Sequence, residues 1–303
     1  MRIGWKPVFY DAILPMLRCL GPSRCDAALG ILGRAVSALS SRDAIASANA
    51  ALQADWDLAK TQSSLNANVS RFAARDYPLD GLSDPQCFDR FDVHGYEHFE
   101  SARDRGRGVI ILGCHLGAYL SGIHWLFRRG VSLRLLAQRP SHVSRYLQAM
   151  LDRDDVAHPQ SGFSLRRRMP AGEGAGRLVR ARAALKDGLA VYVCGDIPWP
   201  SSQARTGRFL GQDRPFQAVW ADLAEITGAA IVPIFSHHEP NGRYAITFEP
   251  PFPPDPKTAV PRYLKRLEAE ILARPSEAVA YLTWPCYRGE VRKTPARRAL
   301  IPA

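Results

Sequence analysis

Several features that define other classes of protein are missing from this 303-residue chain. Its six cysteines are scattered with no CxxC spacing, so we expect neither a zinc site nor a disulfide framework, but reduced thiols in a cytosol-facing protein. No signal peptide is evident, and no apolar run is long enough to span a bilayer. The N-terminal run of residues 9–20 is short and contains Asp11, Pro15 and Arg18. We therefore expect neither a membrane-spanning segment nor disulfide bonds in this chain.

Acidic residues are in the minority. Against 40 Lys and Arg there are 29 Asp and Glu, which gives a formal net charge of +11 and a pI of about 9.7. This excess favours an anionic partner: nucleic acid, an anionic membrane surface or an acidic carrier protein. A nucleic-acid interface needs basic residues interleaved with aromatics on one element, and here they are dispersed, so we expect no nucleic acid. The run Arg166–Arg168 is either a solvated loop or a contact for phosphate groups.

The first part of the chain, residues 1–77, has helical patterns. Residues 9–20 and 27–39 form a pair of amphipathic helices that either lie in a membrane interface or pack on the protein's own core. Residues 44–65 are rich in Ala and Leu without proline, which predicts one helix with Asp43 as its N-cap. We therefore divide the chain into an N-terminal helical region, 1–77, and a second domain, 78–303.

The second domain alternates apolar strands with helices. Residues 108–114 form a continuous apolar run, as in a strand buried on both faces of a parallel sheet. The alternation predicts an α/β fold with a mostly parallel central sheet and helices on both faces. Further strands are expected at 91–96, 131–137, 188–194, 229–235 and 243–248, helices at 97–105, 118–129, 141–151, 177–186, 216–227 and 260–273, and either element at 278–284.

The turn after the strand at 108–114 is the natural place for chemistry, because functional residues of such sheets gather at the carboxyl ends of the strands. His115 in this turn could take a proton from an attacking hydroxyl, although many histidines at strand ends are structural. Cys114 precedes it, but alternation along a strand points neighbouring side chains apart, which disfavours a Cys–His dyad. Tyr119 could offer a hydroxyl near His115.

A series of motifs in shared order is similar to those of the lipid A biosynthesis acyltransferase family, a branch of the lysophospholipid acyltransferase superfamily. The resemblance extends over residues 5–290. The motifs that carry it are Gly95–Phe99, Gly106–Leu112, His115–Gly117, Gln138–Pro140, Arg182–Gly188 with Asp196 after the next strand, Phe209–Gly211, Thr227–Pro233, Ala273–Pro275 and Trp284.

The resemblance implies transfer of an acyl chain from acyl-carrier protein or acyl-CoA to a membrane lipid or glycolipid. In the family a histidine base is followed five residues later by Glu or Asp, which holds the tautomer of the histidine. His115 matches the histidine, but the carboxylate position is Leu120, which cannot accept a hydrogen bond. Three explanations stay open: Asp196 or Glu97 replaces the carboxylate, a reactive donor needs only the histidine, or catalysis is lost and the protein binds lipid or a carrier protein.

The remaining expectations follow from the same resemblance. His115 and Asp196 are the candidate catalytic residues. Gly117, Arg139, Arg208 and Gly211 are the candidate substrate-binding residues, with Arg139 placed to bind an acceptor phosphate or the carrier's phosphopantetheine. No metal or organic cofactor is implied. The protein is expected to act peripherally at the anionic cytoplasmic face of the inner membrane, on a hydroxyl or amine of its acceptor.

Overall fold

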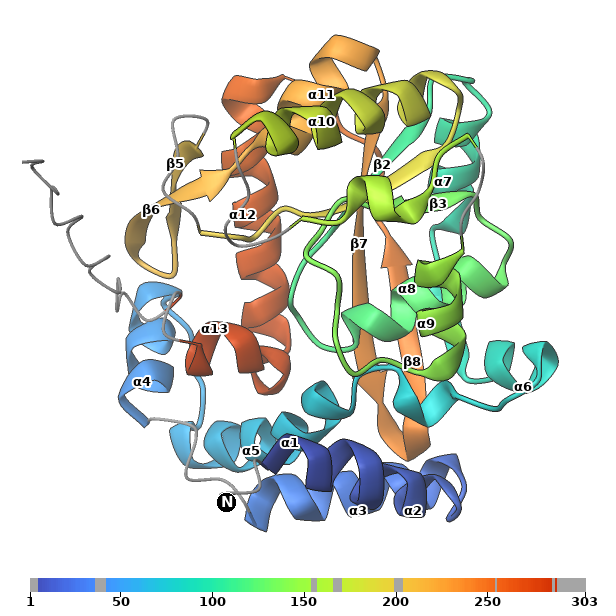
Figure 1. Cartoon of the computed structure of the whole chain (residues 1–303). Coiled ribbons are helices and arrows are strands. Elements are labelled where there is room, and N and C mark those ends of the chain that lie inside the picture. The colour runs from blue at the N-terminus through green and yellow to red at the C-terminus, as the bar shows by residue number, and fades with distance from the viewer. Residues whose placement is uncertain are drawn as a thin grey trace, which may run out of the picture.

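The computed structural model describes residues 5–35, 42–153, 157–165, 171–198, 204–253, 255–284 and 287. A six-stranded sheet lies at its centre in the order β1-β8-β7-β2-β4-β3, and β5 and β6 form a separate hairpin (Figure 1). Neighbours in the central sheet are parallel except β7 and β8, which are antiparallel. The predicted α/β fold with a mostly parallel sheet is therefore confirmed. The strands are β1 (Phe91–His94), β2 (Val109–Gly113), β3 (Leu133–Leu135), β4 (Ala190–Cys194), β5 (Ala204–Phe209), β6 (Gln212–Gln217), β7 (Ala230–Glu239) and β8 (Arg243–Phe248).

Strand β2 shows why both faces of the sheet are covered. All five of its residues are buried. Ile110 and Leu112 belong to one apolar cluster, and Val109 and Ile111 to another, as the alternation of a strand requires. The first cluster packs against α10 (Ala171–Lys186), α11 (Val219–Thr227) and α12 (Pro256–Ala273), and the second against α7 (Tyr96–Arg103), α8 (Tyr119–Arg128) and α9 (Arg145–Asp152).

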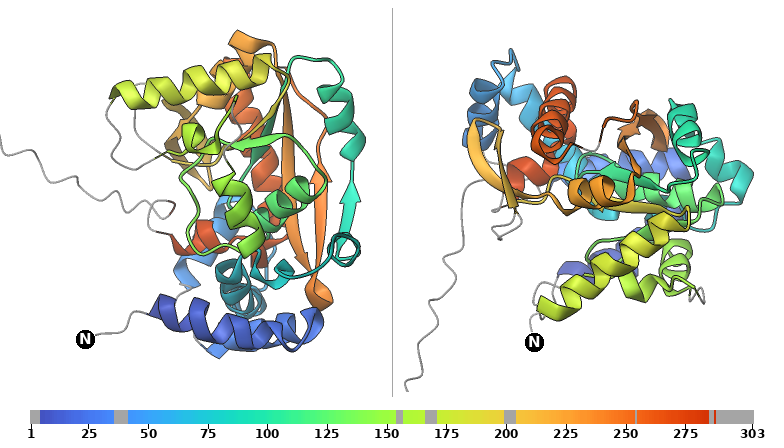
Figure 2. Two further views of the ribbon diagram at one scale, coloured as in Figure 1. Left: turned by 45° about the vertical axis from the view of Figure 1, so that its right-hand side comes forward. Right: turned by 90° about the horizontal axis from the view of Figure 1, so that it is seen from above.

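The N-terminal helices lie together along one end of the molecule (Figure 2). Helix α3 packs along α5, where Arg71 Nε donates to Asp26 Oδ1 at 2.6 Å and Gly33 allows the two backbones to approach closely. The same helix reaches the end of β7, because Ser23 Oγ donates to Asn241 O at 3.1 Å. These elements are α1 (Trp5–Pro7), η1 (Val8–Ile13), α2 (Leu14–Arg18), α3 (Pro22–Ala35), α4 (Arg42–Ala51), α5 (Leu58–Ala74) and η4 (Pro240–Gly242).

The helix predicted over residues 44–65 is wrong as a single element. Two helices, α4 and α5, occupy this region, and a break separates them at residues 52–57. Asp57 causes the restart, because its carboxylate accepts hydrogen bonds from Ala59 N and Lys60 N at 2.9 and 3.0 Å and so caps α5. Asp43, expected to be an N-cap, lies inside the first turn of α4.

One other expectation is wrong, because residues 216–217 end strand β6 instead of opening a helix. Residues 278–284, expected to be either a strand or a helix, contain the helix α13 (Val279–Thr283). The Arg166–Arg168 run and residues 36–39 of the second amphipathic segment lie outside the described residues. Within the described part of the chain, no helix is both long and apolar enough to cross a membrane. The remaining short elements are η2 (Tyr77–Leu79), α6 (Asp84–Phe88), η3 (Gln160–Phe163) and η5 (Pro275–Glu277).

Candidate active site

His115 lies two residues beyond the carboxyl end of β2, in the turn that leads to α8. The turn is tightly packed against its surroundings. Gly117 has a φ of +54°, and a Cβ built on it would clash with Glu277 Oε2 and lie 2.5 Å from the backbone carbonyl oxygen of Ser236. No other residue fits there without a backbone shift, so glycine is required at this position.

The side chain of His115 pairs with Asp196, which follows β4. Nδ1 of the imidazole lies 3.0 Å from Oδ1 and 3.1 Å from Oδ2 of the carboxylate, and the backbone N–H of His115 donates to Oδ2 at 2.8 Å. The Asp196 side chain is 0% exposed and that of His115 is 16% exposed. A carboxylate accepts, so Nδ1 carries the proton and Nε2 is the nitrogen left to accept another.

Two tyrosines from the C-terminal segment hold Asp196. Tyr281 Oη donates to Oδ2 at 2.8 Å, and Tyr287 Oη donates to the backbone carbonyl of Asp196 at 2.9 Å. Burial by itself would raise the pKa of Asp196, but the charge of His115 and these hydrogen bonds outweigh it and lower the pKa below its usual value. Asp196 is therefore an ionised partner for the imidazole. Neither tyrosine was predicted from the sequence.

Aromatic rings surround the imidazole. The ring centroids of Tyr119 and Trp284 lie 5.1 and 5.3 Å from that of His115. The ring centroid of Phe72 in α5 lies 5.9 Å from that of Tyr119 and 5.8 Å from that of Trp284. Burial raises the pKa of the Tyr119 hydroxyl, so it stays protonated at neutral pH. The imidazole therefore lies among aromatic side chains from α8, from α5 and from the residue that follows α13.

Thiols beside the pair are poor nucleophiles. Burial raises the pKa of Cys114 and of Cys194, which keeps both thiols protonated. Donor atoms of His115, Cys194 and Asp196 lie within 4.8 Å of one another. In this group, however, His115 and Asp196 already bind each other, and a metal would need Cys194 as a thiolate, which its burial opposes.

The other predicted residues lie in varied places. Leu120 is 2% exposed and packs in the apolar cluster that contains Ile111. Glu97 is exposed on α7, and it makes no described hydrogen bond or ion pair with His115, so that alternative for the missing carboxylate fails. Arg139 forms an exposed ion pair with Asp152 at 2.5 Å.

The β5–β6 hairpin contains Arg208 and Gly211. Arg208 is exposed, and Gly211 has a φ of +76° in the turn, where it approaches Ala51 of α4. Phe209, between them, packs edge-on against Tyr281 at 5.5 Å. The hairpin therefore contacts the segment that supports Asp196, while the structure describes no contact between Arg208 or Gly211 and His115.

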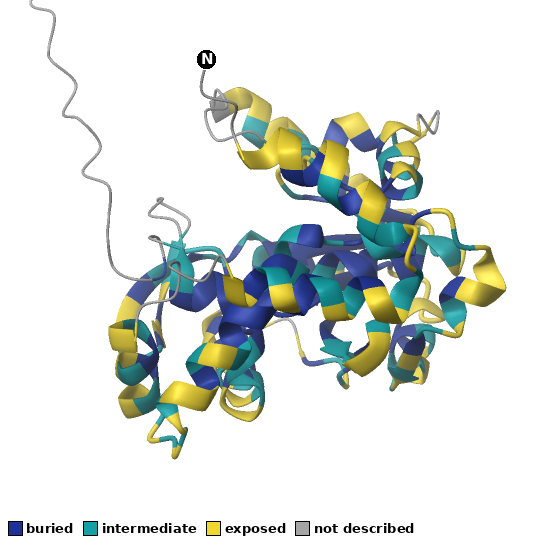
Figure 3. Ribbon diagram, turned by 90° about the horizontal axis from the view of Figure 1, so that it is seen from below, coloured by how far each residue is buried: buried dark blue, intermediate teal, exposed yellow. Residues whose placement is uncertain are grey.

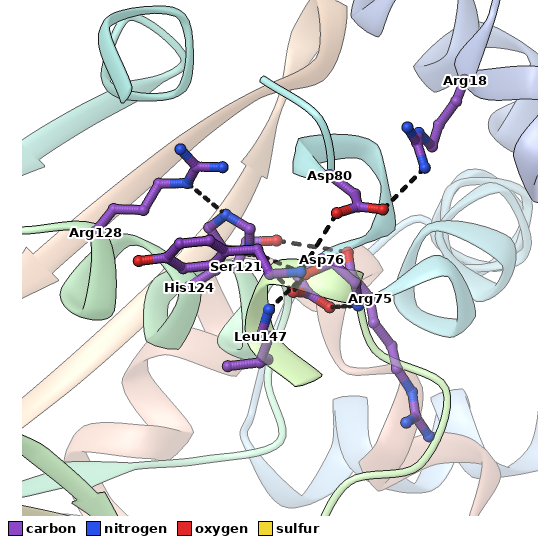
Figure 4. Close-up of polar contacts among 10 residues, drawn as sticks. Arg18, Arg75, Asp76, Asp80, Ser121, His124, Arg128 and Leu147 are labelled. Carbon is purple, nitrogen blue, oxygen red and sulfur yellow. Dashed lines mark hydrogen bonds and ion pairs between the residues drawn. The ribbon is translucent and has the colours of Figure 1, made fainter. Parts of the chain in front are cut away.

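A second His–Asp pair includes His124 of α8 and Asp76, which follows α5 (Figure 4). His124 Nδ1 lies 2.9 Å from Asp76 Oδ2, and Ser144 Oγ donates to the same oxygen at 2.5 Å. Arg128 Nε donates to His124 Nε2 at 2.8 Å, so both imidazole nitrogens are occupied. His124, Asp76 and Ser144 are fully buried. Although it contains Ser, His and Asp, this cluster joins α8, α9 and the end of α5 and has no atom available to a substrate.

Comparison with known proteins identifies the family of the chain. No curated protein matches the chain. The family model described as "Bacterial lipid A biosynthesis acyltransferase" matches residues 2–279, which is most of the sequence and includes the His115 turn and Asp196. The chain belongs to the bacterial lipid A biosynthesis acyltransferase family.

Proposed function

We propose that this protein is an active acyltransferase that uses His115 as its general base and Asp196 in place of the carboxylate missing at position 120. The observation that carries the proposal is the buried contact between His115 Nδ1 and Asp196 at 3.0 Å. In the family motif, the Asp or Glu five positions after the histidine fixes the tautomer of the imidazole and stabilises the imidazolium with its charge. Asp196 does the same for His115 in this proposal.

The reaction follows from this arrangement. Nε2 of His115 removes the proton from a hydroxyl or amine of the acceptor as that group attacks the carbonyl carbon of an acyl thioester. The tetrahedral intermediate collapses, the new ester or amide bond forms, and the thioester bond breaks. The departing thiolate then takes the proton from the imidazolium. The donor in this proposal is acyl-carrier protein or acyl-CoA, and the net charge of +11 suits an acidic carrier.

The acceptor is proposed to be a lipid or glycolipid, reached from the cytoplasmic face of the inner membrane. Exposed apolar side chains on the N-terminal helices support this location, among them Trp5 at 61% and Met16 at 71% exposure. Figure 3 shows the exposed positions of the molecule in yellow. These helices reach the end of β7, and β2 runs parallel to β7, so they lie at the end of the sheet where His115 is found. Substrate contacts are proposed for Gly117, Arg139, Arg208 and Gly211. For Arg139, a phosphate would have to displace Asp152.

Acyl transfer tests the proposal directly. The measurement is movement of labelled acyl chain from carrier protein or CoA to extracted membrane lipid. We expect His115→Ala to reduce kcat by about 10²–10⁴-fold, the usual contribution of a general base. Asp196→Asn should cost up to about 10⁴-fold, as loss of the carboxylate does in related triads.

The matched controls are His94→Ala and Asp92→Asn. They change a surface His–Asp pair, 3.4 Å apart, that lies on β1. Both controls should keep wild-type rates. Equal activity of wild type and His115→Ala would remove His115 as the base. Absence of transfer across a panel of donors and acceptors would instead favour a family member that only binds lipid or carrier protein.

A further inference from the structure

A buried cluster of charged side chains packs against the turn that contains His115. His237, in β7, is 3% exposed. Its Nε2 lies 3.1 Å from Glu270 Oε2 of α12, and its Nδ1 lies 3.1 Å from Glu277 Oε2 of η5. A neutral imidazole has one N–H and can donate to only one carboxylate, so contact with both requires the imidazolium.

The groups around His237 favour this charged form. Burial alone would lower the pKa of His237, but the hydrogen bonds to Glu270 and Glu277 raise it to about 9. The neighbouring His238 on the same strand has its pKa lowered by burial to about 3 and is neutral. Further charges lie around this pair. Arg266 of α12 pairs with Glu270 and with Glu249, which follows β8. Arg274, after α12, pairs with Glu239 of β7 at 2.7 Å and with Glu277 at 3.8 Å.

Glu277 contacts the backbone that follows His115. Its carboxylate fills the space beside Gly117 that a Cβ would occupy. Its carbonyl accepts from Gly117 N at 3.3 Å, and the carbonyl of Ser236, next to His237 on β7, accepts from Ala118 N at 2.8 Å. The two elements that the imidazolium joins, β7 and η5, therefore both hold the turn.

The same segment also reaches the catalytic pair from the other side. After Glu277 the chain enters α13, from which Tyr281 donates to Asp196, and Trp284 then packs against the ring of His115. Figure 1 shows α12 beside the long strand β7, with α13 at the end of this pair. A shift of η5 away from β7 would therefore displace the His115 turn, Tyr281 and Trp284 together.

We propose that the His237–Glu277 ion pair is a positioning device that fixes η5 on β7 and thereby sets the alignment of His115 with Asp196. His237 and Glu277 touch no reacting atom in this role. The inference rests on the proposed function for its catalytic consequence, but its geometric part can be tested without any substrate.

The first measurement is the NMR resonance of the proton on His115 Nδ1, which a hydrogen bond to a buried carboxylate moves strongly downfield. It is assigned by its loss in Asp196→Asn. In His237→Gln and Glu277→Gln we expect this resonance to shift or broaden. In Glu249→Gln, a matched control that removes an outer member of the same cluster, it should stay in place. An unchanged resonance in a folded His237→Gln or Glu277→Gln protein would overturn the proposal.

The second measurement is steady-state kinetics. Misalignment of a base lowers the rate without changing how substrate binds, so kcat should fall about tenfold or more in both variants, with KM within about twofold. An equal fall in kcat in Glu249→Gln would mean that the lower rate reflects a general loss of stability, and this would overturn the proposal. Should Glu277→Gln fail to fold, His237→Gln decides alone. Should the wild type show no transfer, the resonance still tests whether the His237–Glu277 ion pair positions His115. Failure of this proposal and failure of the proposed function are therefore distinguishable.

Discussion

At the scale of single residues, Leu120 gives a clear prediction. Replacement by Glu would restore the family's motif in the sequence, but the side chain is 2% exposed within an apolar cluster. A buried carboxylate without a partner costs several kcal/mol, and the imidazole nitrogen it would bind is already held by Asp196. We therefore expect Leu120→Glu to lower the melting temperature and to add no activity.

Leu120→Met is the matched control, because it keeps the volume and costs less than about 1.5 kcal/mol. Thermal denaturation and acyl transfer, measured below the transition of all variants, provide the comparison. A Leu120→Glu protein as stable as Leu120→Met, with a faster rate than wild type, would contradict the assignment of Asp196 as the partner of His115.

The residues of the site differ in how well the sequence could predict them. His115 follows the strongest strand pattern and matches the family's histidine, so pattern and resemblance agree. Asp196 could be named only as one of two candidates, because nothing in a sequence reports which carboxylate reaches across 81 positions. Tyr281 and Tyr287 carried no local signal at all, since their role arises from the docking of a segment 85 or more positions further along the chain.

At the scale of elements, prediction succeeded where burial on both faces leaves continuous apolar runs, as in β2, β4 and β7. It failed at the β5–β6 hairpin, where Arg214 and Pro215 interrupt the strand pattern and tertiary contacts make the hairpin. The break between α4 and α5 was also missed, because Ala-rich helical propensity hides the restart that Asp57 caps.

The link between β7 and η5 predicts how stability depends on pH. The folded-state pKa of His237 is about 9, above its unfolded value of 6.5. The ion pair therefore contributes fully below pH 6.5, and this stabilisation is lost as the pH rises through about 9. We expect the free energy of unfolding to decline between pH 6.5 and 9 in the wild type, and to decline less in His237→Gln.

Urea unfolding across this range gives the measurement. The difference between the two proteins should be largest near pH 6.5 and shrink towards pH 9.5. His94→Gln provides a matched control, because it removes an exposed histidine whose carboxylate partner is also exposed. Parallel stability curves for wild type and His237→Gln would contradict a charged His237 in the folded protein.

At the scale of the whole molecule, the fold class and the positions of its main strands along the chain followed from sequence, whereas the order of the strands in the sheet and what covers the apolar faces of the N-terminal helices did not. Periodicity identifies an apolar face but not what covers it. In the structure Phe9, Tyr10 and Leu14 turn inward, while Trp5, Met16 and other apolar side chains of the same helices face outward. The same segment therefore has one face that packs on the core and another face whose apolar side chains are exposed.

The outward face predicts membrane binding by a defined set of side chains. Val8, Met16 and Leu20 are exposed and apolar, and burial of such side chains in a lipid interface contributes on the order of 1 kcal/mol each when partial. Their triple replacement by Ser should weaken binding to vesicles that contain phosphatidylglycerol by at least about tenfold. The control is Val179→Ser with Ile226→Ser, which removes exposed apolar side chains from α10 and α11. Vesicle flotation at low and high salt measures both, and the +11 charge predicts weaker binding for every protein as salt rises. Equal losses in the triple variant and its control would mean that the N-terminal helices are not the membrane-facing surface.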